Sequence, residues 1–122
     1  MSEKNINKQI GLKGEEIACN YLKKLGWKIL EKNFRYSKYA EIDIIAKETN
    51  TIVFVEVKTR TTSNFGHPFE AINTKKINNI YKATLSYLQS TQERYEDYRI
   101  DIISILGNPN PKIEHIKNIS LN

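Results

Sequence analysis

Apolar residues recur along the chain with two different periods. Between residues 7 and 25 they return every three or four positions, which predicts an amphipathic helix that ends at Gly26. The next segments are rich in β-branched residues, and they alternate or run continuously apolar, which predicts strands. These predicted strands cover residues 27–36, 40–46 and 51–59. The polar residues 47–50 predict a short turn, so the second and third strands form an antiparallel hairpin.

The second half of the chain repeats this alternation of elements. Residues 60–72 contain Gly66 and Pro68 and predict a loop, and Asn73 or Thr74 then caps a helix that runs to about residue 90. Further strands are predicted over residues 97–106 and, more weakly, 112–119, with a turn at 107–111 between them. The order α-β-β-β-α-β-β predicts one α/β domain over residues 1–122, with a mixed central sheet flanked by helices.

Three charged residues interrupt the apolar hairpin. Glu56 and Lys58 lie two residues apart, so both side chains project from one face of their strand. A two-residue turn at residues 49–50 sets the register and places Asp43 opposite Glu56. Two residues further out, Glu41 faces Lys58. The sequence therefore predicts two carboxylates and an ammonium group close together at the edge of an apolar sheet.

Such a group suits metal-assisted hydrolysis of a phosphodiester. Two opposed carboxylates have Cβ atoms about 5 Å apart, and they repel unless a cation offsets their charge. Mg²⁺ or Mn²⁺ would do so, and Lys58 could stabilise the charge that develops on the phosphate. Glu15 lies at the margin of the apolar stripe of the first helix, from which it could also reach the metal. The competing interpretation is a solvated surface pair, because most E-x-K pairs on strands are of that kind.

Composition narrows the classes of partner and compartment. The net charge is +5 and the pI about 9.3, which favours nucleic acid or another polyanion. The single cysteine, Cys19, excludes a disulfide framework within the chain and suits a reducing cytoplasm. The apolar run at 52–55 is far too short to span a bilayer, so we expect a cytoplasmic protein with no membrane partner.

Seven motifs, in order between residues 8 and 106, carry a resemblance to a known family. They are G-x-x-G-E-x-x-A (Gly11, Gly14, Glu15, Ala18), YLKKLGWKILEKNFR (21–35), EIDIIA (41–46), VFVEVKTR (53–60), FGHPFEAI (65–72), Lys76 and RIDI (99–102). Together they resemble the YraN-like bacterial proteins. That family is similar to the archaeal Holliday-junction resolvases, in the restriction-endonuclease-like PD-(D/E)XK superfamily. The family usually has glycine before the EIDIIA stretch, where this chain has Ala40.

The resemblance implies a fold and roles for particular residues. The fold would be a restriction-endonuclease-like α-β-β-β-α-β core. Asp43, Glu56 and the backbone carbonyl of Val57 would bind the metal, and Lys58 would be catalytic. Glu15 matches the acidic residue on the first helix of the resolvases. A homodimer is also implied, because resolvases cut a four-way junction at two symmetric points.

Basic residues near the predicted site are candidates for contacts with DNA. Arg60 and Lys76 match family positions, and each could bind phosphate or remain a solvated surface group. Lys75 and Arg35 are the further candidates. Such contacts would be sensitive to salt and largely independent of sequence.

Three functions remain open from the sequence. The first is a metal-dependent endonuclease that acts on DNA, including branched or otherwise structured DNA. The second is a nucleic-acid-binding protein that keeps the nuclease fold with weak or no catalysis. The third is an accessory protein in which the acidic cluster is vestigial.

Residues outside the predicted site have simpler interpretations. Asp101 is expected to have a structural role, paired with Arg99 or Arg60, and His115 is expected to be exposed. The seven tyrosines could stack on bases, although most are expected in the core or at its rim.

Overall fold

The computed structural model describes residues 3–60, 73–107 and 110–119. The loop predicted over residues 60–72 lies outside these ranges, apart from Arg60, which ends a strand. The elements are α1 (Glu3–Lys24), β1 (Lys28–Ser37), β2 (Ala40–Glu48), β3 (Thr51–Arg60), α2 (Thr74–Ser90), β4 (Asp97–Leu106) and β5 (Lys112–Ile116). Their order is the one predicted from the periodicity of the sequence, so the expected α/β fold is confirmed.

One predicted end of an element is confirmed and another is wrong. Asn73 caps α2 as predicted, because its side-chain oxygen accepts a hydrogen bond of 2.8 Å from the backbone N–H of Lys76. The last strand is shorter than predicted and ends at Ile116. Asn118 then has a φ of 57°, in the left-handed region, which an extended strand cannot continue through. Asn33 inside β1 also has a positive φ, whereas Ala40 does not.

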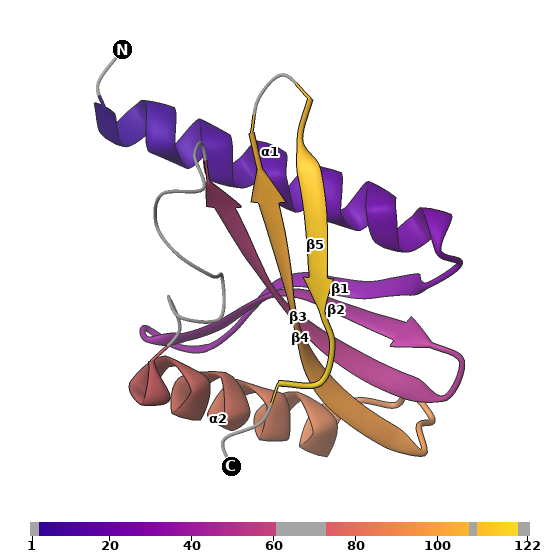
Figure 1. Cartoon of the computed structure of the whole chain (residues 1–122). Coiled ribbons are helices and arrows are strands. Elements are labelled where there is room, and N and C mark those ends of the chain that lie inside the picture. Colours follow the sequence, from indigo (N-terminus) through magenta and orange to yellow (C-terminus); the bar gives the residue numbers. More distant parts are fainter. Residues whose placement is uncertain (1–2, 61–72, 108–109, 120–122) are drawn as a thin grey trace.

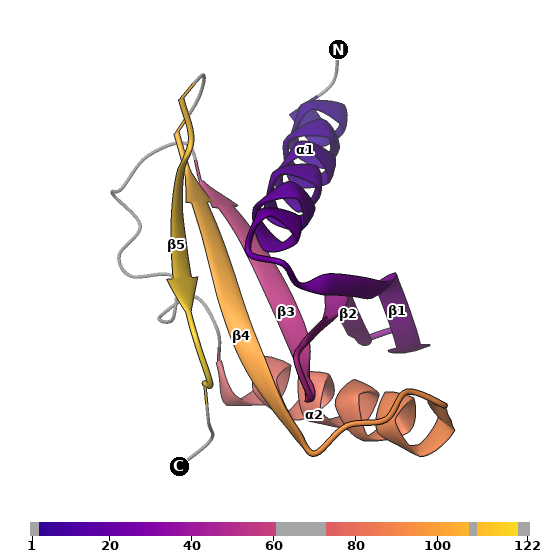
Figure 2. The same ribbon diagram turned by 90° about the vertical axis from the view of Figure 1, so that its right-hand side faces the viewer.

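The five strands form one sheet in the order β1-β2-β3-β4-β5. β3 and β4 are parallel, and the other neighbouring pairs are antiparallel. A parallel pair needs a crossover connection, and α2 provides it between β3 and β4. Figures 1 and 2 show α1 and α2 on opposite sides of this twisted sheet.

The register of the central hairpin is the predicted one as far as it extends. β2 and β3 pair from Glu48↔Thr51 to Ile44↔Val55. The ladder then stops, so the predicted pairing of Glu41 with Lys58 is wrong. Glu41 instead forms an ion pair with Arg35 on β1, in which Oε2 of Glu41 lies 3.3 Å from a guanidinium nitrogen of Arg35. The hairpin therefore opens at the step where Asp43 and Glu56 would have paired.

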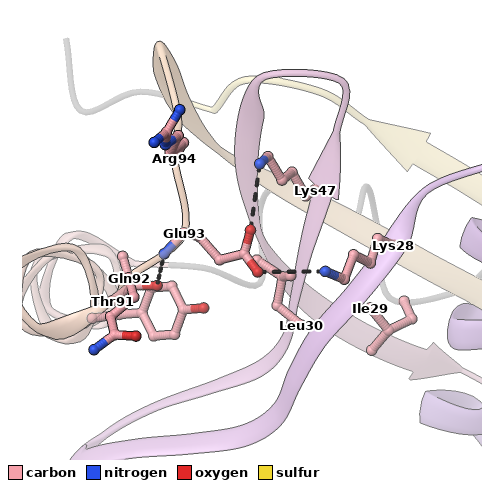
Figure 3. Close-up of a pocket in the computed structure, with 9 residues that line it drawn as sticks. Lys28, Ile29, Leu30, Lys47, Thr91, Gln92, Glu93 and Arg94 are labelled. Atoms are coloured by element: carbon pink, nitrogen blue, oxygen red, sulfur yellow. Dashed lines mark hydrogen bonds and ion pairs between the residues drawn. The ribbon is translucent and has the colours of Figure 1, made fainter.

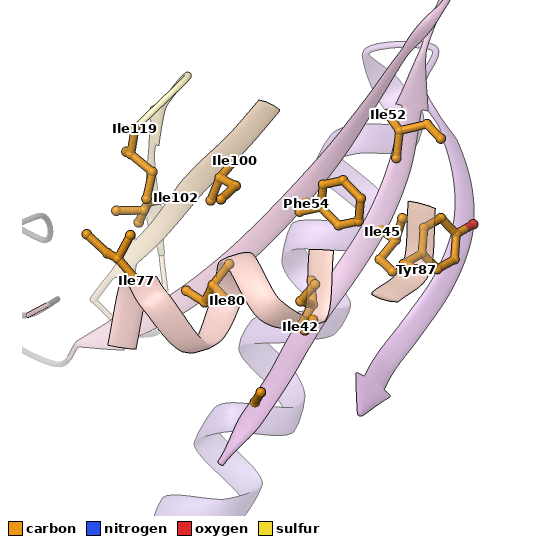
Figure 4. Packing of buried hydrophobic residues seen from close by; sticks show 12 residues of the cluster. Ile42, Ile45, Ile52, Phe54, Ile77, Ile80, Tyr87, Ile100, Ile102 and Ile119 are labelled. Atoms are coloured by element: carbon orange, nitrogen blue, oxygen red, sulfur yellow. The ribbon is translucent and has the colours of Figure 1, made fainter. Parts of the chain in front are cut away.

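Each face of the sheet carries its own hydrophobic core. On the α2 side, Ile77, Ile80 and Tyr87 of the helix point toward the sheet (Figure 4). The sheet residues that they meet there include Ile42, Ile45, Ile52, Phe54, Ile100 and Ile102. The α1 side buries Ala18, Cys19, Leu22, Trp27, Ile44, Ala46, Val53, Val55, Ile103 and Ile105. Covering both faces of β3 explains why its sequence is continuously apolar up to Val55.

A glycine brings α1 close to β3. A Cβ atom on Gly14 would lie 2.5 Å from Cγ2 of Thr59, which is closer than two carbon atoms can approach. The small residue of the G-x-x-G-E motif therefore allows the next residue, Glu15, to reach the open end of the hairpin. Neither of the two helices described is long and apolar enough to cross a membrane.

Candidate active site

Asp43 occupies the place where the hairpin opens. Its Oδ2 accepts a hydrogen bond of 2.8 Å from the backbone N–H of Val57. The side chain thus takes the backbone donor that a continued ladder would have used. In an antiparallel pair, the N–H and C=O of one residue point to the same neighbour, so the Val57 carbonyl also faces this gap. Asp43 and that carbonyl therefore lie on the same side of β3.

Glu56 is a buried carboxylate with two lysine partners. Its side chain is 6% exposed, and Oε1 lies 2.8 Å from Nζ of Lys76. Nζ of Lys58 lies 3.6 Å from the same oxygen. Lys58 comes from β3 itself, whereas Lys76 comes from the first turn of α2. Two ammonium groups thus offset a carboxylate that is otherwise removed from water.

The ionisation of these groups reflects burial and mutual charge. Burial, followed by repulsion from Glu56, raises the pKa of Asp43 from 3.8 to about 7, against the lowering effect of the Val57 N–H. Burial lowers the pKa of Lys58, and the neighbouring Lys76 lowers it further. Burial also acts to lower the pKa of Lys76, but attraction to Glu56 outweighs it and the pKa is raised. A further positive charge close to Asp43, in addition to the two lysines, would lower the pKa of Asp43 and restore its charged carboxylate at neutral pH.

Glu15 approaches the same aspartate from the α1 side. Burial raises the pKa of Glu15, while hydrogen bonds with the side chains of Asn33 and Asp43 lower it. The charges of Glu41 and Glu56 act on Glu15 as well and raise its pKa. Asp43 therefore stands between a glutamate from α1 and a glutamate on β3. Asn33, the residue with positive φ in β1, is the partner of Glu15 that sequence patterns alone did not reveal.

A hollow of about 400 Å³ opens over the carboxylates on the α2 side. It is lined by Lys38, Tyr39, Glu41, Asp43, Glu56, Asn73, Lys75, Lys76, Asn79 and Ile80. The lining includes the N-terminal turn of α2, where the helix dipole favours anions. Three lysines in the lining add positive charge, so the hollow offers carboxylates for a cation and basic groups for a phosphate. Lys38 and Asn79 are lining residues outside the predicted site, and Tyr39, one of the tyrosines considered for stacking on bases, lines the hollow too.

A larger hollow, of about 780 Å³, lies at the other end of α2. There Glu93 lies between Lys28, at 3.5 Å, and Lys47, at 3.4 Å (Figure 3). This single carboxylate is already satisfied by two lysines and is not near a second acid in the lining. The hollow therefore lacks the paired acids that the predicted chemistry needs.

The predicted site residues do not all gather at the carboxylates. The structure brings together Asp43, Glu56, Lys58, Lys76 and, from α1, Glu15. Lys75 lines the hollow, but neither Arg35 nor Arg60 is among its lining residues. Arg35 forms an exposed ion pair with Glu41. Any contact of the two arginines with DNA would therefore be made outside the hollow.

The donor set is compatible with a cation that keeps part of its own hydration. Within the described ranges, no three acidic, histidine or cysteine side chains converge closely enough to hold a metal by themselves. Mg²⁺ needs fewer protein ligands, because it is commonly bound by one or two carboxylates together with phosphate oxygens and water. Asp43, Glu56 and the Val57 carbonyl fit that pattern, and their role as ligands stays a prediction.

His115 is not exposed as predicted. Its side chain is 6% exposed, and Nε2 lies 2.8 Å from Oδ2 of the fully buried Asp101. Its Nδ1 lies 3.0 Å from the hydroxyl of Tyr21 on α1. Arg99 binds the same aspartate at 3.0 Å, which confirms the expected structural pairing of Asp101. The position of His115 near the end of the sequence gave no indication that β5 folds back against α1.

The sequence of this chain is similar to those of bacterial proteins over nearly the full length of each. The profile of a family described as "Uncharacterised protein family UPF0102" matches residues 14–105. A UPF0102 protein of Syntrophomonas wolfei is 46% identical over 114 residues, which cover 93% of this chain and 98% of that protein. The UPF0102 protein TTE1452 of Caldanaerobacter subterraneus is 48% identical over 120 residues, covering 94% and 98% respectively. These matches agree with the resemblance to the YraN-like proteins.

Proposed function

The chain belongs to the uncharacterised protein family UPF0102, and from its site we propose that it is a metal-dependent endonuclease that hydrolyses DNA phosphodiester bonds. The resemblance to resolvases favours branched or otherwise structured DNA as the substrate. A nuclease of this kind would act in the cytoplasm, and a symmetric homodimer would let it cut a junction twice.

One observation carries the proposal: the half-buried carboxylate of Asp43 and the buried carboxylate of Glu56 line the same hollow, beside the ammonium group of Lys76. Burial, and after it repulsion from Glu56, raises the pKa of Asp43 to about 7. Lys76 lies 2.8 Å from Glu56. Keeping such a pair of acids lowers stability, which suggests that they are retained for binding a cation.

Each residue of the site has a distinct part in this chemistry. Asp43, Glu56 and the Val57 carbonyl would hold a Mg²⁺ or Mn²⁺ ion, which would supply Lewis-acid stabilisation of the phosphate. Lys58, held 3.6 Å from Glu56, would donate hydrogen bonds to the attacking water or to a phosphate oxygen. The lowered pKa of Lys58 makes it a better proton donor than an ordinary lysine. Glu15, when protonated, would donate a hydrogen bond to Asp43 and so help to orient it.

Lys76 would have two partners in turn. Without a bound cation it pairs with Glu56, and its raised pKa keeps it charged. When a cation occupies the carboxylates, Lys76 is released to bind the phosphate beside the N-terminus of α2. This exchange would keep the empty site neutral enough to fold and would make the filled site attractive to DNA.

The test compares cleavage by the wild type with cleavage by site variants. Plasmid, linear, flap and four-way-junction DNA are incubated with protein and Mg²⁺, Mn²⁺ or EDTA. We expect cleavage that requires the metal and that falls at least a hundredfold in Asp43→Ala and in Lys58→Ala, as typical for removal of an electrostatic catalyst. Lys82→Ala, an exposed lysine elsewhere on α2, and Asp97→Asn, at the far end of the sheet, are the matched controls.

Two outcomes would contradict a nuclease. Cleavage that persists in both site variants would indicate a contaminating enzyme. Salt-sensitive binding without cleavage, in wild type and Asp43→Ala alike, would instead support the alternative of a catalytically weak or inactive DNA-binding protein.

A further inference from the structure

The turn between β1 and β2 carries an exposed tyrosine, Tyr39, that lines the hollow, and Tyr36 near the end of β1 is exposed as well. Tyr39 is 74% exposed and Tyr36 is 53% exposed. An exposed aromatic ring leaves an apolar face that a flat ligand can cover. Neither ring is needed by the two hydrophobic cores, which do not include them.

The turn is built to hold Tyr39 at the rim of the hollow. Ser37 and Ala40 are paired, so Lys38 and Tyr39 form the two-residue connection between the strands. The Tyr39 N–H donates a hydrogen bond of 3.3 Å to the Ser37 hydroxyl. Lys38 and Tyr39 both line the hollow that contains Asp43 and Glu56. A group bound at the carboxylates therefore has this turn as its neighbour.

A positive charge accompanies the rings. Nζ of Lys38 lies 5.7 Å from the centre of the Tyr39 ring. Lys75 and Lys76, from the first turn of α2, line the same hollow. An aromatic face flanked by ammonium groups is the combination that binds a base together with its phosphates.

We infer that Tyr39, supported by Lys38, stacks on an unpaired base next to the phosphate that a cation at Asp43 and Glu56 would hold. In a duplex, the two faces of each base are covered by its neighbours, so a tyrosine can cover a base only where the stack is interrupted. The preferred substrate is thus nucleic acid with an unpaired nucleotide beside the scissile bond, such as a flap, gap or single strand. This inference rests on the proposed function for the position of the phosphate.

The test measures binding rather than cleavage, so that it does not depend on catalysis. Fluorescence anisotropy in Ca²⁺, which binds carboxylates in place of Mg²⁺, follows three labelled DNAs of the same sequence: a single strand, a blunt duplex and a duplex with a three-nucleotide flap. We expect Tyr39→Ala to weaken binding of the single strand and the flap at least fivefold, which corresponds to about 1 kcal/mol, the lower end of base stacking on an aromatic ring. Binding of the blunt duplex should change less than twofold.

Two further variants separate stacking from other causes. Tyr39→Phe keeps the ring and should bind all three DNAs as the wild type does. Tyr95→Ala removes a tyrosine that is 40% exposed and is not among the lining residues of the hollow, and it should also leave binding unchanged. A 2-aminopurine at the flap nucleotide should lose fluorescence on binding to the wild type and to Tyr39→Phe, but not to Tyr39→Ala.

Three results would overturn the inference. The first is that Tyr39→Ala loses equal affinity for the duplex and the flap. The second is that Tyr39→Ala loses affinity for none of the DNAs. The third is that Tyr39→Phe loses as much affinity as Tyr39→Ala does. Any of them can occur in a protein that still cleaves DNA with metal. Conversely, stacking can be found in a protein that never cleaves, so the two proposals fail separately.

Discussion

The Asp43 carboxylate accepts a hydrogen bond of 2.8 Å from the backbone N–H of Val57, at the step where β2 and β3 stop pairing. This contact fixes a carboxylate between two strands, instead of on either face of the sheet. It explains how Glu56, on the α2 face, and Glu15, on α1, both act on the same aspartate. The candidate site depends on this local opening of the hairpin.

Replacing Asp43 by asparagine should stabilise the metal-free protein while abolishing cleavage. The folded-state pKa of Asp43 is raised to about 7 from 3.8, so the charged carboxylate destabilises the fold as pH rises above 4 and most fully above 7. Asparagine keeps an acceptor for the Val57 N–H and carries no charge. We expect the free energy of unfolding in urea with EDTA to rise by about 2 kcal/mol at pH 8.

This stabilisation should depend on pH and on metal. At pH 5 the folded-state carboxyl is largely protonated but the unfolded-state carboxyl, with a pKa of 3.8, is still ionised, so the gain from Asp43→Asn should be smaller than at pH 8 and should vanish only below about pH 4. Mg²⁺ should raise the stability of the wild type and not that of the variant, because only the wild type binds it. A variant that is less stable than the wild type at pH 8 in EDTA would contradict the proposed repulsion.

Lys76→Met should weaken both the empty site and the binding of DNA. Lys76 is 42% exposed, so loss of its 2.8 Å pair with Glu56 should lower stability by only about 1 kcal/mol. If Lys76 also binds phosphate, the slope of log affinity against log salt should fall by about one. Lys82→Met, on the exposed side of the same helix, should change neither quantity. If the slope of log affinity against log salt is unchanged in Lys76→Met, Lys76 does not bind a DNA phosphate and only pairs with Glu56.

Gly14→Ala should destabilise the protein through one contact. The new Cβ would lie 2.5 Å from Cγ2 of Thr59, a stiff β-branched side chain on β3. Overpacking of this kind costs about 1–3 kcal/mol, and the better helix propensity of alanine offsets about 1 kcal/mol of it. The net loss, measured by urea unfolding, should be about 1 kcal/mol. Cleavage should fall as well, because a displacement of α1 at residue 14 would move the next residue, Glu15, away from Asp43.

Thr59→Ser provides the control for that contact, since it removes the Cγ2 methyl and keeps the hydroxyl. In the Thr59→Ser background, Gly14→Ala should cost at least about 1 kcal/mol less than it does in the wild type. Equal costs in both backgrounds would mean that the close approach of α1 to β3 does not require glycine.

Asp101→Asn should be among the most destabilising single changes. Burial alone would raise the pKa of Asp101, but hydrogen bonds with His115, Asn118 and Arg99 hold it below its ordinary value. The stabilisation from this carboxylate is therefore present above pH 4 and is lost as pH falls through its lowered pKa. Removing the charge leaves Arg99 without this partner, so we expect a loss of about 3 kcal/mol at pH 7.

The same change should alter acid unfolding. The wild type should lose stability steeply below pH 4, whereas Asp101→Asn should show a shallower loss over that range. The measurement is the free energy of unfolding in urea from pH 7 to pH 3. A variant with the full acid sensitivity of the wild type would show that other carboxylates cause it. Since these residues lie away from the hollow, metal binding by the folded protein should be unchanged.

The sequence by itself determined the elements and the composition of the candidate site. The period of the apolar residues located the helices and strands of the described part of the chain, because local geometry dictates which positions face a core. The turn at residues 49–50 fixed the hairpin register from Glu48↔Thr51 to Ile44↔Val55. Glu56 and Lys58 were placed on one face by the pleat alone.

Only the tertiary structure decided how these groups meet. A register extended from the turn predicts a continued ladder, whereas the Asp43 side chain takes the Val57 N–H and opens the hairpin there. The pairing of Lys76 with Glu56 and the burial of His115 join residues far apart in the sequence. Periodicity reports which side a residue faces but not which distant residue it meets, because that depends on how the helices pack across the sheet.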